Sequence, residues 1–221
     1  MRQASYAQRV DGTAPAASSR AARRDQATAD TRAAILAAGR ACLLRDGYAS
    51  LSTRNVAETA GVPLSQIHYH FGSKQRLVLA MLEAENERLL QRQRAMYGSP
   101  EPLWQQWERA CDFLDEDLES GYVRVLQEMV AAGWSDAEVA AAVRGYLSGW
   151  YTLLAEVAER EAHRVGGLGP FSAAEVASLM GLPFMGAEAA ILLGLPESIV
   201  PARSALRKVG VVLRMLEEGP A

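Results

Sequence analysis

The segment from Thr53 to Phe71 limits the possible fold more narrowly than any other part of the sequence. It contains two short helical patterns separated by a tight turn at Gly61. Glycine suits such a turn because it readily adopts a positive φ. Small and apolar residues stand where the two helices would cross: Val56, Ala57 and Ala60. The pattern predicts helices at about 53–60 and 64–70, arranged as a helix-turn-helix.

The second of these helices has the two faces that a DNA-reading helix needs. Val62, Ile67 and Phe71 are spaced to anchor it on a core. Polar side chains project from the other side: Ser65, Gln66, His68, Tyr69 and His70. A helix of this length fits the major groove of B-DNA, where its first residues reach base edges. A purely structural corner between two helices would show the same pattern, so the pattern alone leaves both readings open.

Helical periodicity continues along most of the chain. Apolar residues recur at spacings of three and four, and no segment alternates apolar and polar residues as a half-buried strand would. With 49% hydrophobic and 22% charged residues, the chain can bury a substantial core. The expected fold is all-α, with a small N-terminal helical unit joined by a long helix to a larger helical bundle. Further helices are predicted at about 28–46, 74–97, 101–119, 122–132, 136–164, 173–193 and 198–216.

Charge is distributed unevenly along the chain. Residues 1–80 hold 11 basic and 5 acidic residues, whereas residues 81–221 hold 12 and 21. A basic first third suggests contact with a polyanion, although a solvated basic tail would give the same count. Residues 1–26 lack apolar periodicity and are expected to form a flexible arm. Its arginines either follow DNA phosphates or face solvent: Arg20, Arg23 and Arg24.

Cysteine content and hydropathy indicate the cellular compartment of the protein. Cys42 and Cys111 are too few for a disulfide scaffold or a cysteine-based zinc site. No apolar run reaches the length of about 18 residues that a membrane span needs, and the N-terminus lacks the apolar stretch of a signal peptide. We therefore expect a cytoplasmic protein with no membrane partner. Its DNA-binding domain is expected at 27–75 and a larger helical domain at 76–221.

Over residues 28–80 the chain resembles the TetR family of transcriptional regulators. The resemblance implies a DNA-binding unit of three helices, a helical ligand-sensing body and a homodimer built on the last two long helices. His68 is a departure, because the family usually has tyrosine at this position. The residues that carry the resemblance are Ser52-Thr53-Arg54, Val56-Ala57-Glu58, Ala60-Gly61-Val62, Ile67-His68-Tyr69-His70-Phe71-Gly72-Ser73-Lys74 and Leu77.

The resemblance and side-chain chemistry together suggest roles in DNA binding. Arg54 and Gln66 are the expected base readers, because arginine pairs with guanine and glutamine with adenine through two hydrogen bonds each. Leu64 is placed to touch a thymine methyl group, with Ser65 and His68 as secondary readers. Phosphate contacts set the register on DNA rather than the sequence that is read. They are expected from Thr53, Tyr69, His70 and Lys74, with packing as the alternative for Tyr69 and His70.

Large aromatic and sulfur-containing residues are concentrated in the body, and all four tryptophans lie beyond residue 100. At helical spacing such residues usually form a core, but the resemblance implies that some line an effector pocket. The candidates are Trp104, Trp107, Cys111, Met129, Trp134, Trp150, Tyr151 and Phe184. Possible polar partners are Gln127, Glu128, His163 and Glu188. This composition predicts a small apolar or aromatic effector, with no cofactor and no metal.

The two C-terminal helices are expected to hold a homodimer. The helices at 173–193 and 198–216 combine small residues, which allow close approach, with a large apolar area. A buried helix pair within one chain would look similar. A two-fold dimer also places two reading helices about one DNA turn apart, which favours a palindromic double-stranded operator as the partner.

The sequence therefore predicts a sequence-specific transcriptional regulator, a repressor that a small effector releases from its operator. One alternative is an all-α enzyme that binds a metal through the acidic residues between Asp112 and Glu119. Such an enzyme would need a second acidic pair facing the same cavity, and we find none. The sequence also has no Gly-rich phosphate loop and no nucleophile motif, and runs of charged residues are usually solvated. Another alternative is a helical module that binds no DNA. No catalytic residue is expected.

Overall fold

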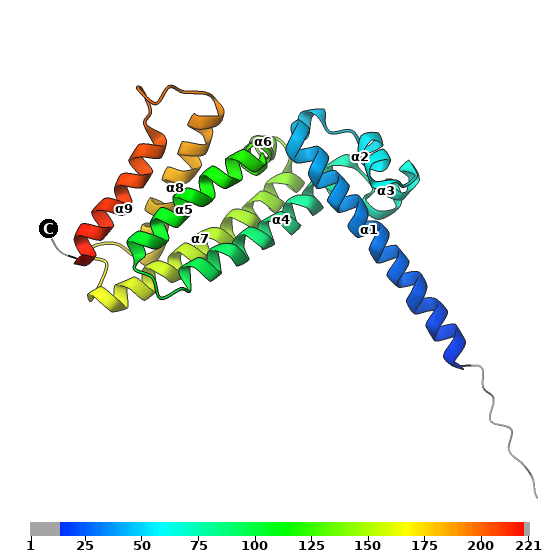
Figure 1. Ribbon diagram of the computed structural model, residues 1–221, viewed down its shortest axis with the longest axis horizontal. Helices are drawn as coiled ribbons and strands as arrows, with labels where there is room; N and C mark the ends of the chain where they lie inside the picture. The colour runs from blue at the N-terminus through cyan, green and yellow to red at the C-terminus, as the bar shows by residue number, and fades with distance from the viewer. Residues whose placement is uncertain (1–13, 219–221) are drawn as a thin grey trace, which may run out of the picture.

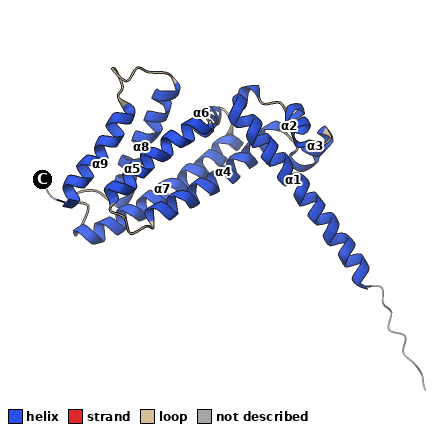
Figure 2. Ribbon diagram, viewed as in Figure 1, coloured by secondary structure: helices blue, strands red, loops and turns tan. Residues whose placement is uncertain are grey.

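The computed structural model describes residues 14–218, and within them the chain forms nine α-helices and no strand (Figures 1 and 2). The predicted all-α fold is confirmed. The molecule is elongated, with α1, α2 and α3 at one end and α8 and α9 at the other (Figure 1). The helices are α1 (Ala14–Ser50), α2 (Thr53–Ala60), α3 (Leu64–Phe71), α4 (Lys74–Tyr97), α5 (Leu103–Ser120), α6 (Tyr122–Gly133), α7 (Ala137–Val165), α8 (Ala173–Leu192) and α9 (Ala202–Glu218).

The head consists of α1, α2, α3 and the start of α4, which share one apolar core. Five of its side chains are fully buried and come from all four helices: Ile35, Cys42, Val56, Ile67 and Leu77. The backbone N–H of Val62 donates to the carbonyl of Ala57 (3.0 Å) and closes the turn between α2 and α3. This packing fixes α3 by its apolar side and leaves its other side to solvent.

The body is a bundle in which α7 packs against α4, α6 and α8, while α5 packs against α9 (Figure 1). The carboxylate of Glu217 in α9 accepts hydrogen bonds from the backbone N–H groups of Leu103 (3.3 Å) and Trp104 (3.1 Å) at the start of α5. It also pairs with Arg164 of α7 at 2.7 Å. Negative charge at a helix N-terminus is favourable, so Glu217 holds three helices together.

The helix α1 begins earlier than the sequence predicted. Periodicity indicated a start near Thr28, but the helix begins at Ala14, and residues 20–30 are exposed. Alanine recurs through this stretch and has the highest helix propensity, whereas the prediction relied on an apolar stripe that an exposed helix does not need. The part of the predicted arm that precedes Ala14 lies outside the described residues. At the other end of the helix, a non-helical Gly47 (φ 77°) interrupts the run, where the sequence predicted a stop.

The head and the body meet where the end of α1 packs against α6. The guanidinium of Arg124 donates from Nη2 to the carbonyl oxygen of Leu44 (2.5 Å). The carboxylate of Glu128 accepts a hydrogen bond from the backbone N–H of Tyr48 (2.6 Å). Gly121 lies so close that a Cβ atom there would stand 2.5 Å from the Leu44 carbonyl oxygen. This head–body joint therefore rests largely on backbone groups of α1.

A buried carboxylate, Glu85 of α4, ties α4 to α1. It accepts two hydrogen bonds from Arg40, at 2.6 and 3.0 Å, and it also pairs with Arg88. Burial alone would raise the pKa of Glu85, but the hydrogen bonds from the two arginines outweigh it and hold the pKa at about 2. The ion pairs therefore stabilise the fold above the ordinary glutamate pKa of 4.5, and this stabilisation is lost as the pH falls toward 2.

We expect the melting temperature of the wild type to fall more steeply between pH 5 and pH 3 than that of the Glu85→Gln variant, which has no carboxylate to protonate at this position. Thermal unfolding followed by circular dichroism across this range measures the difference. Glu87→Gln, at an exposed position two residues further along α4, should follow the wild-type curve. Parallel curves for the wild type and Glu85→Gln would contradict the prediction.

Candidate DNA-binding surface and effector cavity

The helix α3 presents its polar face to solvent. Its other face is anchored by Ile67 and Phe71, which are both buried as predicted. Ser65, His68 and Tyr69 are exposed, and 75% of Tyr69 is accessible to solvent. An aromatic residue this accessible on a short helix contributes little to packing, so the face is free to meet another molecule.

The remaining predicted DNA contacts surround this face. Arg54 and Leu64 are exposed, whereas the other members of the set are half-buried: Thr53, Gln66, His70 and Lys74. All nine predicted residues lie on α2, α3 or the first position of α4, at one end of the molecule (Figure 1). Their contacts with DNA stay predictions.

Two of the predicted contacts also have partners within the protein. The Nζ atom of Lys74 donates to the carbonyl of Ala49 (3.4 Å) and lies 4.8 Å from the ring centroid of Tyr48. The Nδ1 atom of His68 lies 3.3 Å from the carbonyl oxygen of Gly72. Lys74 therefore helps to close the head, besides the phosphate contact expected of it.

Sequence reasoning missed one basic residue near α3. The guanidinium of Arg32, on the exposed part of α1, lies 5.2 Å from the ring centroid of Phe71. Its position one helical turn before the buried Ile35 was the available signal, because it places Arg32 near the head core. Arg32 adds positive charge beside α3.

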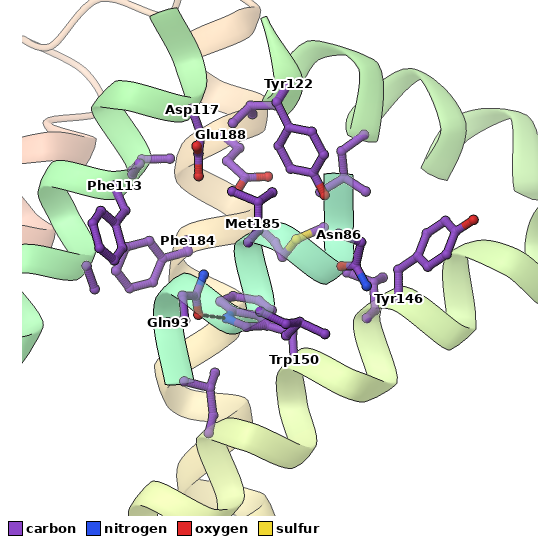
Figure 3. A pocket seen from close by; sticks show the side chains of 18 of the residues that line it. Asn86, Gln93, Phe113, Asp117, Tyr122, Tyr146, Trp150, Phe184, Met185 and Glu188 are labelled. Carbon is purple, nitrogen blue, oxygen red and sulfur yellow. Dashed lines mark hydrogen bonds between the residues drawn. The ribbon is translucent and has the colours of Figure 1, made fainter. Parts of the chain in front are cut away.

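A cavity of about 90 Å³ lies inside the body, with walls from α4, α5, α6, α7 and α8 (Figure 3). Its wall is mainly apolar, as in most small-molecule sites. Seven aromatic side chains contribute to it: Tyr97, Trp107, Phe113, Tyr122, Tyr146, Trp150 and Phe184. The polar lining residues are Asn86, Gln93, Asp117 and Glu188.

Three of the eight predicted pocket residues line this cavity, namely Trp107, Trp150 and Phe184. The other five lie elsewhere, because helical spacing identifies an apolar face without distinguishing a cavity wall from solid core. Met129 and Cys111 are buried in the core, and burial raises the pKa of the Cys111 thiol to about 11. Tyr151 packs beside Trp150, Trp104 lies under the guanidinium of Arg214, and Trp134 is 84% exposed.

Of the predicted polar partners, Glu188 alone lines the cavity. Gln127 donates to it from outside the wall (2.7 Å), Glu128 belongs to the head–body joint, and His163 is exposed. Sequence reasoning missed Asp117 as a pocket residue, because it counted Asp117 among the acidic residues of α5. It also missed Gln93, which accepts a hydrogen bond from the indole N–H of Trp150 (2.8 Å; Figure 3).

The two carboxylates of the cavity differ in their partners. Asp117 accepts a hydrogen bond from Arg92 (2.6 Å), and burial nevertheless raises its pKa. Burial raises the pKa of Glu188 to about 7. The hydrogen bond from Gln127 lowers this pKa by less than burial raises it, and the nearby charge of Asp117 raises it further. A carboxylate that titrates near neutral pH in a pocket is typical of a functional site.

The acidic residues of α5 are paired with arginines. Asp112 and Asp115 contact Arg207, and Asp115 also contacts Arg203, at distances of 2.8 to 3.0 Å. These pairs join α5 to α9, which explains the acidic run structurally. In the described part of the chain, no group of three or more His, Cys, Asp or Glu side chains is placed to hold a metal ion.

Exposed apolar side chains are concentrated on α8, on α9 and at the residue after α8, and we call this set the C-terminal apolar face. It consists of Leu179, Leu182, Leu193, Val209, Val211, Val212, Met215 and Leu216, all exposed. The helix α8 is long and apolar enough to cross a membrane by composition, with 33% of the relevant window buried in the fold. Exposed apolar area of this extent marks an interaction surface.

The N-terminal part of the chain matches a known family. Residues 35–81 match the family described as bacterial regulatory proteins, tetR family. This segment contains α2, α3 and every predicted DNA contact. No curated protein sequence matches the chain.

Solved structures share the fold over most of the chain. A TetR-family transcriptional regulator from Rhodococcus sp. is 21% identical with a TM-score of 0.66, covering 84% of this chain and 98% of that one. E. coli NemR in its reduced form is 22% identical with a TM-score of 0.63, covering 81% and 96%. A transcriptional regulator from Saccharomonospora viridis, in complex with choline, is 20% identical with a TM-score of 0.66, covering 81% and 95%.

The two findings agree on the same architecture. The family match covers α2 and α3, and the structural likeness, at these identities, establishes the fold over most of the chain. Residues 35–81 are thus similar to the DNA-binding region of the tetR family of bacterial regulatory proteins, and the chain has the fold of the TetR-family regulators.

Proposed function

We propose that the protein is a homodimeric repressor that reads an operator through α3 and leaves it when a small effector enters the cavity. The observation that carries the proposal is the arrangement of the α6 helix. The side chains of Tyr122, Val123 and Leu126 line the cavity, while Arg124 and Glu128 on the same helix bond to the backbone of α1 in the head. A change in the cavity wall thus has a short physical route to the reading unit.

The helix α4 offers a second route. It begins beside α3 at Lys74 and reaches the cavity through Asn86, Leu89, Leu90 and Gln93. An effector can shift the equilibrium only by binding one head arrangement more tightly than the other. The neighbour from Saccharomonospora viridis, which is in complex with choline, supports a small molecule as the effector class.

The C-terminal apolar face supplies the dimer interface in this proposal. A second copy of the chain would bury its leucine and valine side chains, and a two-fold axis would set two α3 helices for successive major grooves. The operator is then a palindrome. Since its target is chromosomal DNA, we place the protein in the cytoplasm and assign no membrane partner and no catalytic role.

Base reading by Gln66 gives a direct test. Gln66→Ala should weaken binding to the operator by about tenfold, because a bidentate contact to adenine is worth about 1–3 kcal/mol, and should change binding to random DNA little. Fluorescence anisotropy with a labelled fragment from the gene's own upstream region, compared with a scrambled fragment, measures both affinities at several salt concentrations.

The matched control is Gln91→Ala, which removes the same side chain from an exposed position on α4. It should leave both affinities unchanged. Equal losses on the two DNA fragments for Gln66→Ala would show that Gln66 does not read bases. Equal and weak binding of the wild type to both fragments would contradict a sequence-specific regulator of this upstream region.

A further inference from the structure

The cavity contains one carboxylate for which the described residues provide no positive partner. Glu188 is 9% exposed and lines the cavity from α8. Its one hydrogen bond comes from the neutral amide of Gln127, which donates to Oε2 at 2.7 Å. The other carboxylate oxygen, Oε1, has no hydrogen-bond partner among the described residues. A buried charge without a partner is costly, so its presence calls for an explanation.

The neighbouring Asp117 is also a carboxylate, so it cannot be the positive partner of Glu188, and its negative charge makes ionisation of Glu188 less favourable. Its own charge is compensated by Arg92, which donates at 2.6 Å and stacks over the ring of Phe113 at 3.9 Å. Both carboxylates lie at the same end of the cavity in Figure 3. No lysine or arginine is among the residues that line the cavity. The cavity therefore carries the unbalanced negative charge of an ionised Glu188.

The rest of the wall suits a positive ligand as well. The rings of Tyr122, Trp150 and Phe184 line the same cavity as Glu188. Aromatic faces attract organic cations, by about 0.5–2 kcal/mol each depending on desolvation. An anionic ligand would instead meet two carboxylates with no basic residue in the wall, and repulsion would exclude it.

We propose that the effector is a small organic cation whose ammonium group pairs with Glu188 inside the aromatic wall. This inference rests on the proposed function, because it names the class of molecule that the effector cavity accepts. The cavity volume of about 90 Å³ is smaller than the 150 Å³ or so that holds a benzene molecule. This space limits the ligand to an ammonium head with a short apolar body. The flexible side chains of Met180 and Met185, also in the wall, can adjust to a longer body.

The pairing makes binding depend on pH. Burial raises the pKa of Glu188 to about 7, so a cation that binds at pH 6 must displace a proton, whereas at pH 8 it need not. The charged group that acts on Glu188 is Asp117, which is itself paired with Arg92. The phenols nearby, Tyr122 and Tyr151, have pKa values raised by burial and stay neutral. Cation affinity should therefore rise about tenfold from pH 6 to pH 8.

Three compounds with the same carbon chain test the charge preference: butylammonium, 1-butanol and butyrate. Titration of the free protein at pH 8, followed by tryptophan fluorescence and by the methionine methyl signals in NMR, gives the three affinities. Met185, which lines this cavity, reports binding in the cavity itself. We expect butylammonium to bind at least about tenfold more tightly than 1-butanol, and butyrate not to bind.

Glu188→Gln keeps the shape of the side chain and the hydrogen bond with Gln127 but removes the charge. In this variant butylammonium should bind within about twofold of 1-butanol, and the pH dependence should disappear. The control Glu87→Gln, exposed on α4, should bind as the wild type does. A preference for butylammonium that survives in Glu188→Gln would overturn the inference, and so would equal binding or no binding of the three compounds.

These titrations use no DNA, so their result is independent of the anisotropy measurements on operator fragments. Selective butylammonium binding that leaves the protein–DNA complex intact would support the cation site and refute the release mechanism. Operator binding without cation selectivity would leave the DNA-binding function in place and refute the inference about Glu188.

Discussion

Replacing both Leu182 and Leu216 with glutamate is expected to convert the proposed dimer into monomers and to reduce operator affinity at least 100-fold. The two side chains belong to the C-terminal apolar face and are 61% and 77% exposed. Each glutamate would place a charge within the proposed apolar interface, where its desolvation is not compensated. A monomer engages one half-site and loses the gain of about 10²–10⁴ that two linked contacts provide.

Because both positions are exposed within one chain, the substitutions should change the stability of the monomer fold little. Sedimentation velocity gives the oligomeric state, circular dichroism confirms the fold, and anisotropy gives the affinity for the upstream fragment. Trp134→Glu is the matched control, since it introduces the same charge at an exposed apolar residue outside the C-terminal apolar face. A double variant that stays dimeric would place the interface elsewhere.

The sequence predicted the helical architecture because each element carries its own signal. The start of α4 at Lys74 follows Gly72 and Ser73, and Ser73 caps the helix by accepting a hydrogen bond from the backbone N–H of Arg76. The helix-turn-helix was predictable for a similar reason, since a glycine and a set of small residues occupy fixed positions in a short stretch. The start of α1 could not be predicted in this way, because an exposed alanine-rich helix has high helix propensity but no apolar stripe.

The cavity was only partly predictable, since its wall comes from five helices that are distant in sequence. Trp107 and Met129 show the difficulty. Both are large, apolar and regularly spaced, yet Trp107 lines the cavity and Met129 is fully buried in the core. Asp117 was misleading in the opposite direction, because it lies in an acidic run in which Asp112, Asp115 and Glu116 pair with arginines at the surface. Which side of a helix meets a void depends on packing between helices, and no local pattern encodes it.

The largest effect on stability is expected from Gly121→Ala, which should lower the free energy of unfolding by about 3 kcal/mol or more. Gly121 has a φ of 83°, a left-handed conformation that costs a residue with a side chain about 1–2 kcal/mol. The added Cβ atom would also stand 2.5 Å from the carbonyl oxygen of Leu44. Backbone cannot move aside as a flexible side chain can, so the turn between α5 and α6 must shift away from α1.

Gly166→Ala separates the two contributions. Gly166 has nearly the same φ, 84°, but no atom lies within 4 Å of the position that a Cβ would occupy. Its substitution should therefore cost only the conformational part, about 1–2 kcal/mol, in chemical unfolding followed by circular dichroism. Equal losses of unfolding free energy in the two variants would show that Gly121 is needed only for the positive φ of its turn. A larger loss at Gly121 would demonstrate the close contact between the start of α6 and the Leu44 carbonyl of α1, on which the proposed route from the cavity to α3 depends.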